Sequence, residues 1–202
     1  MATLTSAATA RVLNPTLAQK IMTATEAAAL IRSADQIGMS GFTGSGYPKA
    51  VPLELAHRIA EAHLRGQKFQ VSVFTGASTG PELDGAVAMA GGIHLRLLYP
   101  SHPETRKRIN SGEMDYMDIH LSHVAQFVEY GFLGKLDVAL IEVAAVLGWK
   151  KESSKADFLH RGDSGRHDSI AKVGQAHLRL GHGFLAEPGN ADGSEREYGQ
   201  LP

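Results

Sequence analysis

The chain has 202 residues, a formal net charge of −1 and 43% hydrophobic residues, which suits one or one and a half globular domains. A net charge so close to zero gives no electrostatic footprint for nucleic acid or an anionic membrane. The sequence has no long apolar run and no charged-then-apolar leader, so we expect neither a membrane span nor a secretory signal. The absence of cysteine excludes disulfides, zinc–thiolate sites and a cysteine nucleophile, and favours a cytoplasmic protein.

The N-terminal part of the chain predicts a flexible start followed by a capped helix. Residues 1–19 are small and polar, and we expect a flexible segment there. Thr23-Ala24-Thr25-Glu26 is a capping box, with Thr23 as the N-cap and Glu26 reaching back to it. The helix should end near Ser33, and Ile37 to Ser40 should form the first clear strand.

Helices and strands are predicted to alternate from there to about Leu147. The expected helices span 51–65, 81–90, 103–111 and 122–128, and the expected strands span 69–74, 94–98, 116–120 and 136–144. We expect Pro81 to begin one helix and Ser122 to cap another. The continuous apolar run 136–144 predicts a buried strand. The alternation predicts an α/β fold with an open, mainly parallel sheet flanked by helices.

The last quarter of the chain differs in character from the α/β domain predicted over residues 20–147. Residues 148–202 are rich in charge and glycine, hold four of the ten histidines, and show no sustained period of 2 or 3.6. We therefore expect a poorly structured tail, with one weak helix over Ile170–Leu180 as its best helical candidate.

A glycine-rich loop follows the first strand and is the strongest candidate site. Glycine tolerates φ > 0 and has no Cβ, so the loop's N–H groups can approach an anion, and the start of the next helix adds donors. The expected ligand is a carboxylate, phosphate or pyrophosphate, and the candidate residues are Gly41, Thr43, Gly44, Ser45, Gly46 and Lys49. A turn whose glycines serve packing alone is the alternative.

A second polar loop, residues 75–80, follows the next strand, with Thr75, Gly76 and Ser78 as its candidate binding residues. Ligands of parallel sheets bind outside the carboxyl ends of the strands. Because both loops leave carboxyl ends, they can line the same crevice.

Four segments resemble the N-terminal half of the acetyl-CoA hydrolase/transferase family, which includes succinyl-CoA:acetate CoA-transferases. The order and spacing of the segments match the family over residues 11–147. The segments are SGFT (40–43) with GYPKAVP (46–52), TGASTG (75–80) with ELDG (82–85), DIHLSH (118–123), and GFLG (131–134) followed by DVA (137–139).

The resemblance implies acyl transfer between coenzyme A and a carboxylic acid. In the family a glutamate attacks the acyl-CoA thioester, and the resulting anhydride becomes a glutamyl-CoA thioester that a second carboxylate resolves. Backbone N–H groups stabilise the oxyanions, and the glycine loop helps to hold the small carboxylate. The implied ligands are acetyl-CoA or succinyl-CoA and acetate, with the CoA thioester as substrate, no separate cofactor and no metal; a homodimer is compatible with the resemblance.

The chain departs from the family pattern in its loop and beyond the α/β domain. Gly44-Ser45-Gly46 stands where the family has Pro-Ala-Gly, which predicts a more mobile loop with an added hydroxyl. The family's nucleophilic glutamate lies in a C-terminal half that has no counterpart here, so we expect no catalytic residue and no turnover. Glu82 at a helix start and Glu142 in a core strand are expected to be structural.

The tail also lacks the family's continuation after Leu147. Reading the codons of residues 174–190 with a one-base shift permits two of the missing family segments at the right separation. We therefore hypothesise a frameshift near Leu147, which sequencing the encoding DNA tests.

Two other functions stay open on the sequence alone. A glycine loop after a strand also occurs in dinucleotide-binding Rossmann domains, although Gly44 and Gly46 are followed by Lys49 and so miss the full fingerprint. The other is a non-catalytic subunit that docks a separately encoded C-terminal half.

His120 and His123 carry a weaker chemical signal. A predicted strand end separates them and no third ligand is evident, so we do not expect a metal site. Ser122 lacks a nucleophile-elbow sequence and is not expected to be a hydrolase nucleophile.

Overall fold

The computed structural model describes residues 20–41, 46–75, 80–143, 145–150, 155–160, 169–172 and 185–186, together with Val12 and Pro15. Its helices are α3 (Ala24–Ala29), α4 (Ala50–Leu64), the π-helical turn η1 (Pro81–Gly85), α5 (Ala86–Met89), α6 (Pro103–Asn110) and α7 (Leu121–Glu129). Its strands are β1 (Ile21–Met22), β2 (Gln36–Met39), β3 (Val71–Thr75), β4 (Ile93–Leu97), β5 (Asp115–Met117), β6 (Val138–Leu140), β7 (Ala145–Lys150), β8 (Lys155–His160), β9 (Ser169–Lys172) and β10 (Leu185–Ala186).

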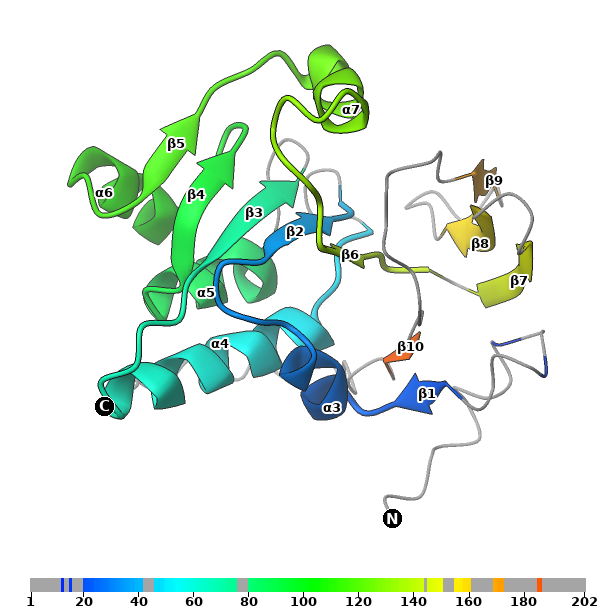
Figure 1. The fold of residues 1–202 in the computed structure, drawn as a ribbon, viewed down its shortest axis with the longest axis horizontal. Helices are drawn as coiled ribbons and strands as arrows, with labels where there is room; N and C mark the ends of the chain where they lie inside the picture. Colours follow the sequence, from blue (N-terminus) through cyan, green and yellow to red (C-terminus); the bar gives the residue numbers. More distant parts are fainter. Residues whose placement is uncertain are drawn as a thin grey trace.

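A parallel sheet in the order β5-β4-β3-β2-β6 forms the centre of the described chain (Figure 1). The chain builds this sheet outward from β2 to β5 and then crosses back to place β6 on the other side of β2. The strand order therefore reverses between β2 and β6, which is where ligands of such sheets bind. The predicted fold class, a mainly parallel α/β sheet flanked by helices, is confirmed.

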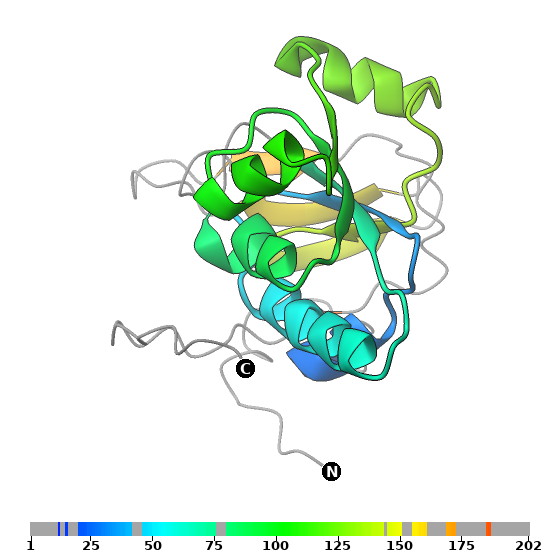
Figure 2. The ribbon, with the colours of Figure 1, turned by 90° about the vertical axis from the view of Figure 1, so that its left-hand side faces the viewer.

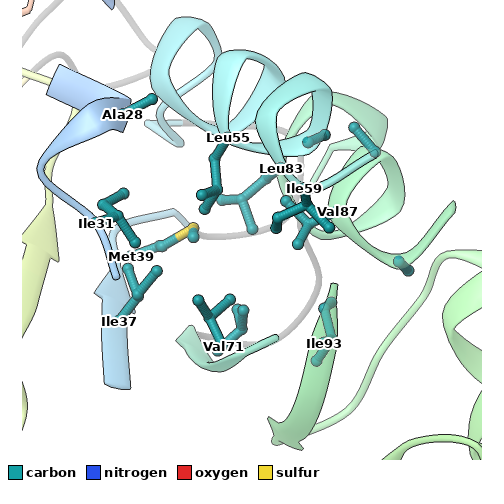
Figure 3. Close-up of a cluster of buried hydrophobic side chains, with 14 of the residues drawn as sticks. Ala28, Ile31, Ile37, Met39, Leu55, Ile59, Val71, Leu83, Val87 and Ile93 are labelled. Atoms are coloured by element: carbon teal, nitrogen blue, oxygen red, sulfur yellow. The ribbon is translucent and has the colours of Figure 1, made fainter. Parts of the chain in front are cut away.

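The main core lies between one face of the sheet and helices α3, α4 and α5. Figure 3 shows Leu55 and Ile59 of α4 pointing toward Val71 on the sheet, and all three side chains are fully buried. Leu55, Ile59 and Ala62 recur at helical spacing, so one stripe of α4 faces the strands. Gly66, with φ of 72°, follows the C-cap residue of α4, where the helix ends close to the expected residue 65.

The opposite face of the sheet is covered less completely. A smaller apolar cluster of Phe74, Leu97 and Leu98 lies there, packed by Val124 and Val128 of α7. Figure 2 shows α7 standing apart from α4, α5 and α6, and no residue of α7 is buried by the described part of the chain.

The capping box is confirmed, but two other expectations about helix ends are wrong. Thr23 caps α3 and Glu26 bonds back to the Thr23 backbone, as predicted. The helix ends at Ala29 and not near Ser33: the N–H groups of Leu30 and Ile31 already bond to the carbonyls three residues earlier. Ser122 does not cap α7: the N-cap is His120, and the Ser122 hydroxyl lies 2.9 Å from His120 Nδ1 instead of meeting the backbone.

The strand expected over residues 136–144 is shorter and less buried than its apolar run suggested. β6 covers only Val138–Leu140 and lies at the edge of the parallel sheet, with β2 as its neighbour there. Each of its residues is half-buried, because an edge strand is enclosed on one side only. Glu142 therefore lies beyond the strand's carboxyl end and not in a core strand, which corrects its expected position.

The described parts of the tail form short strands outside the parallel sheet. β7, β8 and β9 make an antiparallel sheet, and β10 pairs with β1. Where a helix was expected from Ile170, the structure has β9; the rest of the expected helix lies outside the described residues. No helix in the described ranges is long and apolar enough to cross a membrane.

A β-bulge turns Arg96 into the main core. Val71 pairs with Ile93 but the next residue of β3 pairs with Leu95, so β4 carries one extra residue and its alternation reverses. Arg96 is fully buried and its Nε lies 3.1 Å from Asp84 Oδ2 of η1. Burial lowers the pKa of the Arg96 guanidinium, and the Asp84 carboxylate opposes that change. The sequence carries no signal for this bulge.

Asp84→Asn should destabilise the fold strongly, because it leaves the Arg96 guanidinium buried without a counter-charge. We expect the free energy of unfolding to fall by about 3–5 kcal/mol, measured by urea unfolding. Asp115→Asn is the control, since the His94–Asp115 pair is 3.6 Å apart and exposed, and should change it by less than about 0.5 kcal/mol. Equal effects of the two substitutions would contradict the importance of the buried pair.

Candidate functional site

The glycine loop lies at the reversal point of the sheet. It leaves the carboxyl end of β2, and α4 begins at its far end with Lys49 as the N-cap. Gly41 and Gly46 have φ of 133° and 64°, a region that favours glycine, so both described ends of the loop need that residue type. Thr43, Gly44 and Ser45, the other predicted loop residues, lie outside the described residues.

The Ser40 hydroxyl bonds across the two ends of this loop and joins them to the segment after β6. Ser40 Oγ donates to the Gly46 carbonyl at 2.7 Å and accepts from the Glu142 N–H at 3.0 Å. The Ser40 N–H also donates to the Leu140 carbonyl at 2.9 Å. One side chain therefore fixes the start and end of the loop and the segment that follows β6.

Lys49 lies beside the loop with its charge already paired. Its Nζ is 3.0 Å from Glu142 Oε2, donates to the Tyr47 carbonyl at 3.1 Å, and lies 4.0 Å from the centre of the Tyr47 ring. The Lys49 and Glu142 side chains are 39% and 31% exposed, so water still reaches the pair. Lys49 was expected to contact an anionic ligand; the structure gives it a carboxylate partner from the chain itself.

The second polar loop approaches the first through Tyr47. The Tyr47 hydroxyl donates to Glu82 Oε2 at 2.7 Å, and a Cβ added to Gly80 would fall 2.1 Å from the Tyr47 ring. Gly80 is therefore needed for this close approach, and the flanks of the two loops meet at one edge of the sheet. Thr75 ends β3 and is buried, whereas Gly76 and Ser78 lie outside the described residues.

Asp137, from the DVA segment, joins β6 to β2 at the opposite end of the strands. Its Oδ2 accepts from the Gln36 N–H at 3.1 Å, and its own N–H donates to the Gln36 carbonyl at 2.9 Å. A hydrogen bond from Lys135 lowers the pKa of the Asp137 carboxyl. Asp137 thus sets the register of the edge strand whose far end carries Glu142.

His120 is the N-cap of α7, and His123 lies in the first turn of that helix. Their ring centres are 5.6 Å apart, and His123 stacks on Phe127. No group of three ligating side chains gathers anywhere in the ranges that the structure describes.

Sequence reasoning missed Ser40, Tyr47 and Glu142 as members of the site. The first two stand in the segments that carry the family resemblance, but each acts through a long-range contact that no local pattern reveals. Glu142 was masked by the apolar run around it, although a glutamate is seldom buried in a strand core and so marks a strand end.

Ser40→Ala should loosen the loop, because the Gly46 carbonyl and the Glu142 N–H both lose their partner. We expect the free energy of unfolding to fall by about 1–3 kcal/mol and hydrogen exchange at the Glu142 amide to accelerate. Ser111→Ala, which removes a hydroxyl with exposed contacts, should change stability by less than about 0.5 kcal/mol. Unchanged exchange at Glu142 would show that the hydroxyl does not join the segments.

The chain also matches known proteins. Residues 8–148 match the acetyl-CoA hydrolase/transferase N-terminal domain. The chain is 41% identical over 136 residues to a succinyl-CoA:acetate CoA-transferase of Clostridium kluyveri, covering 67% of this chain and 25% of the relative. It is 42% identical over 125 residues to a propanoyl-CoA:succinate CoA transferase of Escherichia coli, covering 62% and 25%.

An acetyl-CoA hydrolase of Schizosaccharomyces pombe is 35% identical over 145 residues, covering 67% of this chain and 27% of the relative. The chain thus spans about a quarter of the length of these curated relatives. Because the family match extends over most of its residues, the chain belongs to the acetyl-CoA hydrolase/transferase family, whose N-terminal domain it contains.

Proposed function

We propose that this chain supplies the carboxylate-binding part of an acyl-CoA:carboxylate CoA-transferase or acetyl-CoA hydrolase site. The observation that carries the proposal is the position of the glycine loop at the β2–β6 reversal point, closed by the Ser40 hydroxyl. The relatives' names, which include succinyl-CoA:acetate CoA-transferase and acetyl-CoA hydrolase, support acyl-CoA and a small carboxylate as substrates.

The proposed binding groups are backbone N–H donors of the glycine loop. Gly41 and Gly46 adopt positive φ values that favour glycine. The N-terminus of the 15-residue helix α4, which is the positive end of its dipole, follows the loop directly. The loop from Gly41 to Gly46, including Thr43, Gly44 and Ser45, receives the acetate carboxylate. Thr75, Gly76 and Ser78 of the second loop are the other proposed substrate-binding residues.

The proposal assigns binding and not covalent catalysis to this chain. A nucleophilic glutamate must bring a carboxylate oxygen to the thioester carbon. At this rim Glu142 is paired with Lys49 and Glu82 accepts the Tyr47 hydroxyl, so both are held by other groups. The attacking carboxylate comes from another part of the complete enzyme, and transfer becomes hydrolysis when water resolves the intermediate.

Acetate should bind to the wild-type chain and shift the amide resonances of Gly41 and Gly46 in NMR titrations. Gly46→Ala should weaken acetate binding by at least about tenfold, because φ of 64° is strained by about 1–2 kcal/mol for a residue with a Cβ. Gly112→Ala is the control: it has φ of 78° at the end of α6, with open space around its Cβ, and should bind acetate as wild type does. Binding of NAD without any acetate binding would favour the dinucleotide-binding alternative.

The purified chain should not cleave acetyl-CoA, because the two glutamates that the structure describes at this rim, Glu82 and Glu142, are both held by other groups. The measurement is the release of free CoA thiol against a buffer blank, with and without acetate. Thiol release that Gly46→Ala abolishes would prove this part of the proposal wrong.

A further inference from the structure

β6 has the sequence of a central strand and the position of an edge strand. The run from Leu136 to Ala144 is apolar except for Asp137 and Glu142, and parallel strands that are enclosed on both sides have such runs. Within the described chain, however, β6 pairs only with β2, and all three of its residues are half-buried. Edge strands of natural sheets are commonly protected by lysine, proline or a bulge, and this run contains no lysine or proline and pairs in regular register.

The bonds on the inner side of β6 identify the groups on its outer side. The Leu140 carbonyl accepts from the Ser40 N–H, and the Glu142 N–H donates to Ser40 Oγ, so both groups face β2. The C=O and N–H of a trans peptide point in opposite directions. The N–H and the carbonyl of Ile141 share peptides with those two groups and therefore face away from β2. No strand in the described ranges pairs with this side of β6.

The sheet face next to β6 is also incompletely covered. Val138 and Leu140 pack against the main core, so Ala139 between them points to the opposite face, beside Gly38 of β2. Leu136 lies over Gly38, since a Cβ added to that glycine would fall 2.9 Å from it. Leu136 is itself only half-buried, and the described chain buries no residue of α7, the helix on this face. This face therefore has room for another helix beside α7.

The handedness of the chain shows which kind of element can cover both places. From β2 outward to β5 the chain places α4 and α5 on the main-core face, and the return from β5 to β6 places α7 on the opposite face (Figure 1). A strand added outside β6 continues in the return direction, so a right-handed connection puts its preceding helix on the α7 face. One helix–strand unit would thus cover the outer edge of β6 and the face beside it.

We propose that the outer edge of β6 and the adjoining α7 face dock a second polypeptide, which carries the part of the family's enzymes that follows the matched residues. The family match ends at residue 148, shortly after β6, and the matched segment is only 25% of the length of the Clostridium kluyveri relative. A helix of the partner lies beside α7, and the apolar strand after it pairs in parallel with β6 through Ala139 and Ile141. This inference concerns assembly and does not depend on carboxylate binding.

Co-expression with the remainder of the Clostridium kluyveri relative tests the proposal. The probe is the part of that protein after its matched 136 residues, without a tag, and the full 202-residue chain carries the affinity tag. We expect the two to copurify as a one-to-one complex. In the complex, hydrogen exchange at the amides of Ala139 and Ile141 should slow at least about tenfold, because they gain partners. A remainder that is recovered only unbound would overturn the proposal.

Ile141→Pro and Ile141→Ala form a matched pair of variants. Both change the side chain, but only proline removes the outward N–H and places a ring at the edge. Both variants should fold, because this N–H makes no bond to β2, and Ile141→Pro should bind the remainder at least about tenfold more weakly than Ile141→Ala. Equal binding would overturn the edge pairing. The exchange measurement on the wild type does not require the proline variant to fold.

The same samples distinguish the other possible occupants. Slowed exchange at Asp115–Met117 of β5, the opposite edge of the sheet, with none at Ile141 would overturn the choice of edge. A wild-type chain that dimerises alone and protects Ile141 would show that a second copy occupies the edge, which also overturns the proposal. The Leu136 methyl resonances should shift in the complex and those of Val87 in the main core should not; the reverse would overturn the helix position.

Discussion

The hydroxyl of Ser40 is the contact on which the candidate site depends. It joins the end of β2, the carbonyl of Gly46 and the N–H of Glu142, which are three segments that no helix or continuous strand connects. β6 is a short, half-buried edge strand, so core packing alone fixes its end weakly. Asp137 sets its register at one end and Ser40 holds it at the other. The two ends of the glycine loop are therefore held together, although glycine residues restrict the backbone conformation little.

A chain of polar contacts extends this constraint across the carboxyl ends of three neighbouring strands. Glu142 follows β6, Lys49 and Tyr47 follow β2, and Glu82 lies in the turn after β3, each contacting the next. Below the same rim, the buried Arg96–Asp84 pair anchors η1 to β4. Exposed ion pairs contribute little free energy, so the half-exposed Lys49–Glu142 pair matters for position more than for stability. The buried Arg96–Asp84 pair matters more for stability than for position, because a guanidinium left unpaired in the core lowers the free energy of unfolding.

The fold followed from local patterns, whereas much of the site did not. The capping box at Thr23 and Glu26 and the apolar stripe of α4 depend on residues three or four apart, and the structure has both. The bulge in β4 and the Tyr47–Glu82 bond depend on which strands become neighbours, which a single sequence does not specify. The apolar run around Glu142 indicated a core strand, because periodicity cannot distinguish a central strand from an edge strand that ends early. Gly41 and Gly46 were identified because their requirement is conformational and local.

The division between binding and chemistry in the proposed site follows from the groups that each step requires. Holding a carboxylate at backbone N–H donors needs only the correct loop conformation, and the Ser40 and Glu142 contacts supply that constraint. Attack on a thioester needs a carboxylate that can reach the thioester carbon, whereas the Glu142 carboxylate is paired with Lys49 and that of Glu82 accepts the Tyr47 hydroxyl. The two described glutamates beside the loop are therefore held in structural roles.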